Sequence, residues 1–228
     1  KMIRVVGINK IDKISDGYTM VKKELRRTMK SKILMGGGLL LVAAALLLTI
    51  YNIRESDQAG KAAEEMVVQM ESLEAGLLER LEPESEELVP EYKKHPEMEM
   101  PVVEVNGQEC IGTIEIPLLD LKLPVISEWS YAKLKKAPCR YSGSAYQNNL
   151  IIAGHNYRTH FSGIKRLDPG DEVIFTDADG NVFSYEVDTI ETVGGTDIEK
   201  MESGDWDLTL FTCTTGGKAR AAVRCKEK

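Results

Sequence analysis

Three side chains in the sequence have the types and spacing needed for nucleophilic acyl chemistry. In LTLFTCTTGGKARAAVRC, residues 208–225, an alternating apolar run ends at Cys213, a Gly-Gly turn follows, and a second alternating run contains Arg220. The run LIIAGH, residues 150–155, ends in the same way at His155. Cysteine is a strong nucleophile only as the thiolate, so it needs a base close by. These residues therefore predict a nucleophilic thiol with an imidazole and a guanidinium close to it.

The position of each residue suggests its role. His155 and Cys213 both stand where an apolar strand gives way to a polar loop, so we expect them to meet at the rim of a barrel. With reference pKa values of about 6.5 and 8.5, roughly one molecule in a hundred would hold the thiolate–imidazolium pair. Arg220 lies on the strand that pairs with the one carrying Cys213, where its donors can stabilise an oxyanion. Arg224 is on the same face, one full repeat farther from the turn, so Arg220 is the preferred candidate.

A second interpretation makes these residues structural. A cysteine on a strand commonly packs as a small hydrophobe, and a strand arginine commonly reaches solvent. The chain would then be a non-catalytic anchored β-domain that binds cell-wall polymer or a protein partner, with His155 and Cys213 in its core. The two interpretations differ in a measurable property, because a core thiol reacts slowly and without selectivity.

The other histidines and cysteines leave further alternatives open. His155 and His160, in HNYRTH, have the spacing of a histidine pair in some zinc sites, but no cysteine pair or carboxylate motif completes a ligand set. Cys110, Cys139 and Cys225 are candidates for a disulfide in an extracellular chain, and the sequence does not choose a pair.

The residues from about 102 onward have the pattern of a small β-barrel. Short apolar or alternating runs recur at CIGTIEI, LKLPV, NNLIIAGH, DEVIFT, NVFSYEVDTIETV, DLTLFTC and ARAAVRC. Asp179-Gly180 provides one hairpin turn and residues 214–218 provide another. Only two short helices are expected, near residues 130–135 and 161–166. The predicted fold class is mainly β, as a small antiparallel or mixed barrel.

Ahead of the barrel, residues 33–53 are predicted to form a transmembrane signal anchor. Residues 33–51, ILMGGGLLLVAAALLLTIY, hold 19 residues without a charge. As a helix they would be roughly 28 Å long, close to the ~30 Å of a bilayer's hydrocarbon core. A buried soluble helix and a cleaved signal peptide are the alternatives. The 32-residue lead and the following NIRESDQ do not match the short basic lead and small-residue cleavage site of a signal peptide.

The distribution of charge orients the span. Residues 1–32 carry ten Lys/Arg and three Asp/Glu, and KKELRRTMKSK directly precedes the apolar run. Lys and Arg beside a membrane helix tend to stay cytoplasmic. Residues 1–32 are therefore predicted to be a cytoplasmic basic tail of a single-pass membrane protein, with the catalytic part extracellular. We expect no nucleic-acid partner for the acidic remainder of the chain, residues 33–228.

Two segments connect the span to the barrel. Residues 54–81 predict an amphipathic extracellular helix, whose apolar residues recur at spacings of three and four: Ala63, Met66, Val67, Met70, Leu73, Leu77 and Leu81. Residues 82–101 hold four prolines and many glutamates, which is typical of a solvated, semi-rigid linker. The catalytic domain is then expected over residues 102–228.

These motifs resemble those of a known family. TLFTC followed within one hairpin by R-A-A-V resembles the T-L-x-T-C…R-x-x-V motif of sortases, the cysteine transpeptidases of Gram-positive cell surfaces. LIIAGHN is similar to the strand that ends in their essential histidine. IGTIEIPLLDLKLPV resembles their first two strands, and LDPGDEVIFTDADGNVFSYEV the hairpin after the histidine. The resemblance spans about residues 105–224 and implies a sortase-like eight-stranded β-barrel with short helices.

The resemblance also implies a reaction. Cys213 would attack the Thr–Gly type bond of an LPxTG-like sorting signal at the C-terminus of a surface protein, forming a thioacyl-enzyme. His155 would protonate the departing amine and deprotonate the incoming one. Arg220 would hold the substrate carbonyl and the oxyanion, and Thr212 would add a hydrogen bond. The acceptor amine would belong to a cell-wall precursor or, in pilus-building relatives, to a pilin lysine.

Sortases generally need no organic cofactor, and none is expected here. Some relatives bind calcium through acidic loops, a role that Glu199, Glu202 and Asp205 could serve, although loop carboxylates are more often simply solvated.

The sequence departs from parts of the family pattern. The interval from Cys213 to Arg220 is seven residues, at the short end for the family, so the loop that often helps to select substrate is minimal. The linker has no Asp-Pro-aromatic lid, which argues against a lidded pilus polymerase. Residues 194–207 are too few for the long helix of the class that processes NPQTN-like signals. The remaining expectation is a housekeeping-like or clostridial class.

Overall fold

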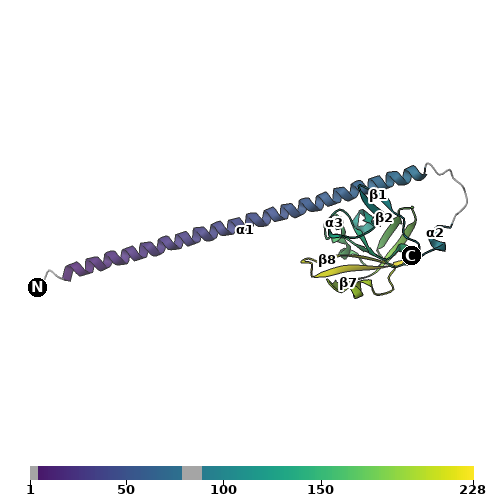
Figure 1. The fold of residues 1–228 in the computed structure, drawn as a ribbon. Helices are drawn as coiled ribbons and strands as arrows, with labels where there is room; N and C mark the ends of the chain where they lie inside the picture. Colours follow the sequence, from purple (N-terminus) through teal and green to yellow (C-terminus); the bar gives the residue numbers. More distant parts are fainter. Residues whose placement is uncertain (1–4, 79–88) are drawn as a thin grey trace. The chain divides into compact units, whose positions relative to one another are not determined.

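A computed structural model describes residues 5–78 and 89–228 (Figure 1). The chain divides into two compact units, residues 1–54 and 55–228. Helix α1, Val5–Leu78, makes up the described part of the first unit and continues into the second. The sequence predicted two consecutive helices here, and the structure joins them without a break.

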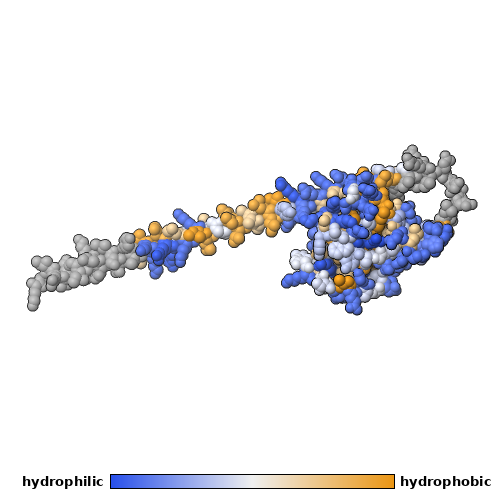
Figure 2. All heavy atoms as spheres, in the orientation of Figure 1, coloured by the Kyte–Doolittle hydropathy of each residue, from blue (hydrophilic) through white to orange (hydrophobic). Residues whose placement is uncertain are grey.

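The helical stretch of the first unit is apolar and exposed. Every residue from 33 to 53 is exposed within this unit, and Figure 2 shows the hydrophobic band that these side chains form. Among the described residues, one helical segment, Met20–Leu73, contains a window long and apolar enough to cross a membrane, with a mean hydropathy of 2.5. Apolar side chains that contact no protein on any face are typical of a helix that faces lipid.

The second unit is a closed β-barrel in the part of the chain that the structure describes. One sheet runs in the order β1-β2-β3-β4-β5-β8-β9-β7-β6, and β6 pairs back with β2. Eight strands therefore close the barrel, while β1 pairs on its outside with β2. The strands are β1 Val103–Val105, β2 Gln108–Ile116, β3 Leu121–Ile126, β4 Cys139–Ser142, β5 Leu150–Ala153, β6 Glu172–Asp177, β7 Val182–Gly194, β8 Leu208–Cys213 and β9 Ala219–Glu227.

Two of the strand pairs are parallel and the others antiparallel. β3 pairs in parallel with β4, and β5 in parallel with β8. The predicted mainly-β, mixed barrel is thus confirmed. Its interior is filled by alternate residues of the strands, including Ile114, Phe175 and Val223, each fully buried. This alternation is the two-residue period that the sequence showed.

The predicted turn at Asp179-Gly180 closes the β6–β7 hairpin. Gly180 has a φ of 85°, a left-handed conformation that glycine adopts without steric cost. The carboxylate of Asp177 accepts hydrogen bonds from the backbone N–H groups of Asp179 and Asn181. The hydroxyl of Tyr146 donates to the same carboxylate at 2.7 Å, which ties the turn to the barrel wall.

The end of α1 packs on the barrel through the predicted apolar face. Ala59, Ala63, Met66, Val67 and Met70 are buried. Met66 and Met70 lie in a cluster with residues of β1, β2, β3 and β4. Leu73 remains exposed, and Leu77 and Leu81 fall outside the described side chains.

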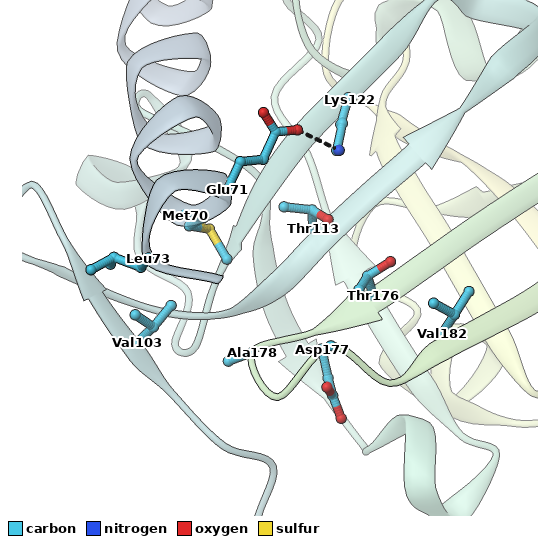
Figure 3. A pocket seen from close by; sticks show the side chains of 11 residues that line it. Met70, Glu71, Leu73, Val103, Thr113, Lys122, Thr176, Asp177, Ala178 and Val182 are labelled. Carbon is cyan, nitrogen blue, oxygen red and sulfur yellow. Dashed lines mark hydrogen bonds and ion pairs between the residues drawn. The ribbon is translucent and has the colours of Figure 1, made fainter. Parts of the chain in front are cut away.

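An ion pair fixes the same part of the helix to the barrel. Glu71 accepts a bond from Lys122 on β3 at 2.6 Å (Figure 3). Beside this pair lies a cavity of about 260 Å³, lined also by Thr113, Thr176 and Asp177.

Part of the predicted linker packs on the barrel instead of being solvated. Residues 82–88 lie outside the described residues, but 89–101 include the short helix α2, Glu91–Lys94. Tyr92 stacks on Tyr146 with ring centroids 4.6 Å apart, and Met100 is buried. Aromatic stacking and apolar burial offset the chain entropy that a free tether would keep.

Short helices connect the strands: η1 Pro117–Leu119, α3 Tyr131–Leu134, η2 Ala145–Gln147, η3 Phe161–Arg166 and α4 Ile198–Glu202. Both predicted helices, near residues 130–135 and 161–166, are confirmed by α3 and η3. Helix α4 was not expected from the sequence. Its first turn is capped by the Asp197 carboxylate, which accepts from the N–H of Lys200.

All four cysteines, each within the described residues, are free thiols. Cys110, Cys139 and Cys225 are fully buried, and burial raises the pKa of each to about 12. The proposed disulfide candidates therefore act as small core residues in this structure.

Candidate active site

The β8–β9 hairpin sets Cys213 opposite Arg220. The two residues are cross-strand partners in the antiparallel register. The turn between them is closed by a hydrogen bond from the N–H of Thr214 to the carbonyl of Ala219 at 2.9 Å. Gly216 and Gly217 have φ angles of 87° and 71°, so both occupy the left-handed region that favours glycine. The Gly-Gly pair therefore permits the tight turn that keeps Arg220 at the level of the thiol.

The parallel pairing of β5 and β8 places His155 at the same level along the strands as Cys213. Ala153 pairs with Phe211, and the N–H of Gly154 donates to the carbonyl of Phe211 at 2.9 Å. His155 and Cys213 each follow two residues after this pair. Neighbouring strands lie about 4.8 Å apart, so their ends present both side chains to one region.

Gly154, between the end of β5 and His155, is required because there is no room for a side chain. A Cβ atom there would lie 2.3 Å from the ring of Phe161, which is fully buried. The absence of a side chain lets the start of η3 close under the residue that follows, His155.

His155, Thr212, Cys213 and Arg220 all line one cavity of about 370 Å³. Its other walls are apolar side chains and two glycine-containing segments: Trp129, Tyr131, Leu134, Tyr141, Ile198, Met201, Phe211, residues 153–154 and residues 194–197. The structure thus brings together the four site residues predicted from the sequence. Cys213 and Arg220 are half-buried, so both are accessible from the cavity.

Aromatic rings form an extended wall beside the thiol. Trp129 lies 5.6 Å from Tyr131 and 5.8 Å from Tyr141, and Tyr141 meets Phe211 edge-on at 5.3 Å, each distance joining ring centroids. Trp129 and Tyr131 remain exposed at the mouth. The sequence analysis did not find this wall, because its four rings come from three separate segments of the chain. It suits apolar side chains of an extended peptide.

The imidazole of His155 is half-buried and stacks on Tyr157. Their ring centroids are 3.9 Å apart with planes 7° from parallel. Its Nδ1 is buried without a hydrogen-bond partner among the described residues. Burial lowers the pKa of His155, the charge of Glu55 opposes that effect, and Lys135 adds to it. Burial therefore favours the neutral imidazole, the form that can accept a proton.

Arg220 is held against its own turn. Its Nη1 donates to the carbonyls of Gly217 and Ala219 at 3.1 and 3.2 Å. Both acceptors are neutral backbone groups, so the positive charge of the guanidinium is not cancelled by either. An uncompensated guanidinium beside a thiol can stabilise negative charge that develops there.

Arg224 has a different environment, although it lies on the same strand. Its side chain is 1% exposed and donates to Glu191, Thr209 and the carbonyls of Lys200 and Met201 at 2.7–3.0 Å. It does not line the cavity. Arg224 therefore fastens α4 to the barrel, through bonds that also reach β7 and β8.

The residues considered for metal binding do not form a ligand set in the described part of the chain. His160 is 1% exposed, does not line the cavity with His155, and its pKa is lowered by burial to about 4. Within residues 5–78 and 89–228, no group of three His, Cys, Asp or Glu side chains is arranged to hold a metal ion, and this includes Glu199, Glu202 and Asp205. The cavity shown in Figure 3 contains none of the predicted site residues.

Comparison with known proteins identifies the same region. A family model described as Sortase domain matches residues 114–228, half of the chain. A solved structure of a Clostridium perfringens sortase D5 transpeptidase is 24% identical with a TM-score of 0.50, over 74% of this chain and 96% of that one. Sortase A from Corynebacterium diphtheriae is 21% identical with a TM-score of 0.48, over 79% and 95% of the two chains. No curated protein matches the chain.

Proposed function

Because the chain belongs to the sortase family, we propose that it is a membrane-anchored cysteine transpeptidase that acts on an LPxTG-like sorting signal. The observation that carries the proposal is the shared cavity of His155, Cys213 and Arg220. Sortases are cysteine transpeptidases, and this cavity contains a nucleophile, a base and an oxyanion partner. These side chains supply every group that the proposed reaction uses, so it needs no cofactor.

In the first half-reaction the thiolate of Cys213 attacks the carbonyl carbon of the scissile peptide bond. The oxyanion that forms is stabilised by the guanidinium of Arg220. The imidazolium of His155 donates its proton to the departing amine as the carbon–nitrogen bond breaks. A thioester between Cys213 and the threonine carbonyl of the signal remains.

In the second half-reaction an acceptor amine attacks that thioester. Neutral His155 removes a proton from the amine, and the sulfur of Cys213 leaves as the thiolate when the new peptide bond forms. The amine would belong to a cell-wall precursor or a pilin lysine. The product would be a surface protein attached covalently to that acceptor.

Two features of the cavity suit the signal. The aromatic wall from Trp129 to Phe211 offers apolar surface for the leucine and proline that precede the threonine. The Oγ1 atom of Thr212 is buried beside the nucleophile and has no partner among the described residues. We propose that it donates to the bound peptide.

The anchor fits the same function. The apolar window in α1 provides a single span, and the basic residues 22–32 before it favour an orientation with the barrel outside. A transpeptidase in that position would meet surface proteins as they leave the membrane.

The test uses the full chain in detergent micelles. Cleavage is measured with a library of fluorogenic LPxTG-like peptides in the presence of hydroxylamine as the acceptor amine. In a separate incubation without hydroxylamine, the thioacyl adduct on Cys213 is identified by mass spectrometry. Cys213→Ala should abolish both cleavage and adduct, whereas the matched variant Cys225→Ala removes a buried thiol and should retain them. Cleavage at the wild-type rate by Cys213→Ala would remove the claim, and so would the lack of any adduct on the wild-type protein.

A further inference from the structure

The loop that follows His155 is fastened to the part of α1 that enters the barrel unit. Arg158 donates from Nη2 to the Asp57 carboxylate at 3.1 Å. The hydroxyl of Thr159 donates to the carbonyl of Ser56 at 2.8 Å. Two consecutive loop residues therefore bond to two consecutive helix residues, which fixes the loop in register along the helix.

A third contact of the same kind reaches the imidazole. The Tyr157 hydroxyl hydrogen-bonds to the carboxylate of Glu55, which also accepts from Lys135 at 2.7 Å. These two bonds hold the pKa of Glu55 below its usual value, so it carries a full negative charge at neutral pH. The ring of Tyr157 is the one stacked on His155. The helix carboxylate is thus connected to the imidazole through a single phenol.

The helix approaches the loop very closely at one residue. A Cβ atom built on Gly60 would lie 2.7 Å from Cγ2 and 2.8 Å from Cβ of Thr159. A short β-branched side chain cannot bend away from such a contact, so any side chain at position 60 must displace the loop. Glycine costs stability inside a helix, and this close approach is a physical reason for having it here.

We propose that residues 55–60 of α1 are a positioning element for the catalytic imidazole, in which Glu55 and the phenol of Tyr157 set the orientation and protonation of His155. The inference rests on the proposed function, in which His155 shuttles the proton. It adds that the helix following the membrane span belongs to the active site as well as to the anchor.

Charged groups from several elements face His155. Glu55 on α1 raises the pKa of His155, whereas burial and Lys135, which follows α3, lower it. His155 in turn lowers the pKa of His160 in the same loop. Cys213 on β8 and Arg220 on β9 complete the set that lines the cavity. Loss of the Glu55 charge should therefore lower the pKa of His155 further and reduce the thiolate–imidazolium population.

The first experiment separates position from charge in the full chain in micelles. Tyr157→Phe keeps the stacked ring but loses the bond to Glu55, and Glu55→Gln keeps a hydrogen-bond acceptor but loses the charge. We expect kcat to fall about tenfold in each with KM unchanged, because the group that moves the proton is misplaced rather than the peptide. The matched control is Glu71→Gln, which breaks an ion pair of the same helix with Lys122, away from the loop that follows His155, and should leave kcat unchanged.

A second pair of variants tests the close approach. Gly60→Ala and Gly76→Ala add the same methyl group to the same helix, but only the first meets Thr159, since a Cβ on Gly76 has nothing within 4 Å. Gly60→Ala should lower kcat several-fold, and Gly76→Ala should not. Equal kcat in the two variants would overturn the proposal that the loop position matters.

A peptide-free readout distinguishes this inference from the proposed function. The titration of His155 is followed by NMR of ¹⁵N-labelled histidine, with its signal assigned by the His155→Gln variant. In Glu55→Gln the midpoint should move to lower pH, and in Glu71→Gln it should stay. If no peptide is cleaved but the midpoint moves, the proposed function fails and the positioning element stands. If peptides are cleaved while Glu55→Gln changes neither midpoint nor kcat, the positioning element is overturned and the proposed function stands.

Discussion

The two arginines of β9 lie four residues apart and have opposite surroundings. Arg224 is enclosed, and its donors reach one carboxylate, one hydroxyl and two backbone carbonyls. Arg220 is half-buried at the cavity, and among the described residues its side chain bonds only to two carbonyls of its own turn. The first arginine is a completed network, whereas the second keeps hydrogen-bonding capacity for something outside the chain.

The same contrast extends to the residues around each arginine. Near Arg224, the bonds from Lys200 and Arg224 lower the pKa of Glu191 against the raising effect of its burial. In the lining of the cavity, buried polar atoms of Thr212 and His155 have no partner among the described residues. A buried polar atom without a partner costs stability. These two atoms are therefore available to a bound ligand.

The largest effect should come from removing the cavity arginine. Arg220→Ala is expected to lower kcat/KM about 100- to 1,000-fold, as loss of an oxyanion donor does. The unfolding free energy should change by less than about 1 kcal/mol, since the lost bonds are to exposed or half-buried carbonyls. Peptide cleavage and urea unfolding followed by fluorescence of the two tryptophans, both in the barrel unit, measure the two quantities. A large loss of stability in Arg220→Ala would contradict the proposed difference between Arg220 and the structural Arg224.

The reverse result is expected for the enclosed arginine. Arg224→Met should reduce the unfolding free energy by about 3 kcal/mol, because it leaves Thr209 and the carbonyls of α4 without their buried donor. The kcat/KM of the folded fraction should fall far less than in Arg220→Ala. The same urea titration checks this, with Lys226→Met, at a half-buried lysine of β9, as the control. An unfolding free energy equal to that of the wild type would show that the network is dispensable.

Lowering the pH should reduce the unfolding free energy through His160, the buried histidine of the loop. Burial holds the pKa of His160 at about 4, below its unfolded value of about 6.5. Between these values the unfolded chain binds a proton that the folded chain does not, so stability falls as the pH is lowered through this window. From pH 7 to pH 5 the loss from this residue should be about 2 kcal/mol. Urea unfolding of the wild type and of His160→Phe at both pH values measures this loss. If the unfolding free energy changed equally with pH in the two proteins, His160 would not be its source.

The smallest effects should separate two threonines of β8. Thr209 Oγ1 accepts from Arg224 at 3.0 Å, whereas Thr212 Oγ1 is buried without a partner in the described chain. Thr209→Val should cost about 1 kcal/mol of unfolding free energy, and Thr212→Val should cost none. Thr212→Val should instead lower kcat/KM about five- to tenfold, because the bond to the peptide is lost. Equal effects of the two substitutions on stability would argue against a ligand role for Thr212.

Local patterns predicted much of this molecule. The alternation in residues 208–225 and its Gly-Gly turn predicted a hairpin that sets Cys213 opposite Arg220, because antiparallel register follows from turn length. The uncharged run from 33 to 51 predicted the apolar helix from composition and length alone. The family resemblance predicted the closed eight-stranded barrel.

The contacts between distant segments that build the site were not predictable, although the sequence predicted that His155 and Cys213 meet and favoured Arg220 over Arg224. The level shared by His155 and Cys213 comes from the parallel pairing of β5 with β8, and period alone does not reveal which strands pair. Arg220 and Arg224 have the same place in the alternation of β9. Their environments differ because α4 packs over Arg224 and not over Arg220. Tyr92 docks onto Tyr146 from a segment whose prolines and glutamates indicated a solvated tether.

The parallel pairing of β5 and β8 has a consequence for how this domain can change. The backbone ladder ends at Ala153 and Phe211, each two residues before a predicted site residue, so the spacing of the two strand ends does not depend on the length of segment 195–207. Substitutions in that segment can reshape one border of the cavity while the ladder stays intact. The turn at 214–218 lacks this freedom, because it keeps Arg220 opposite Cys213. The barrel therefore combines a fixed core with one replaceable edge.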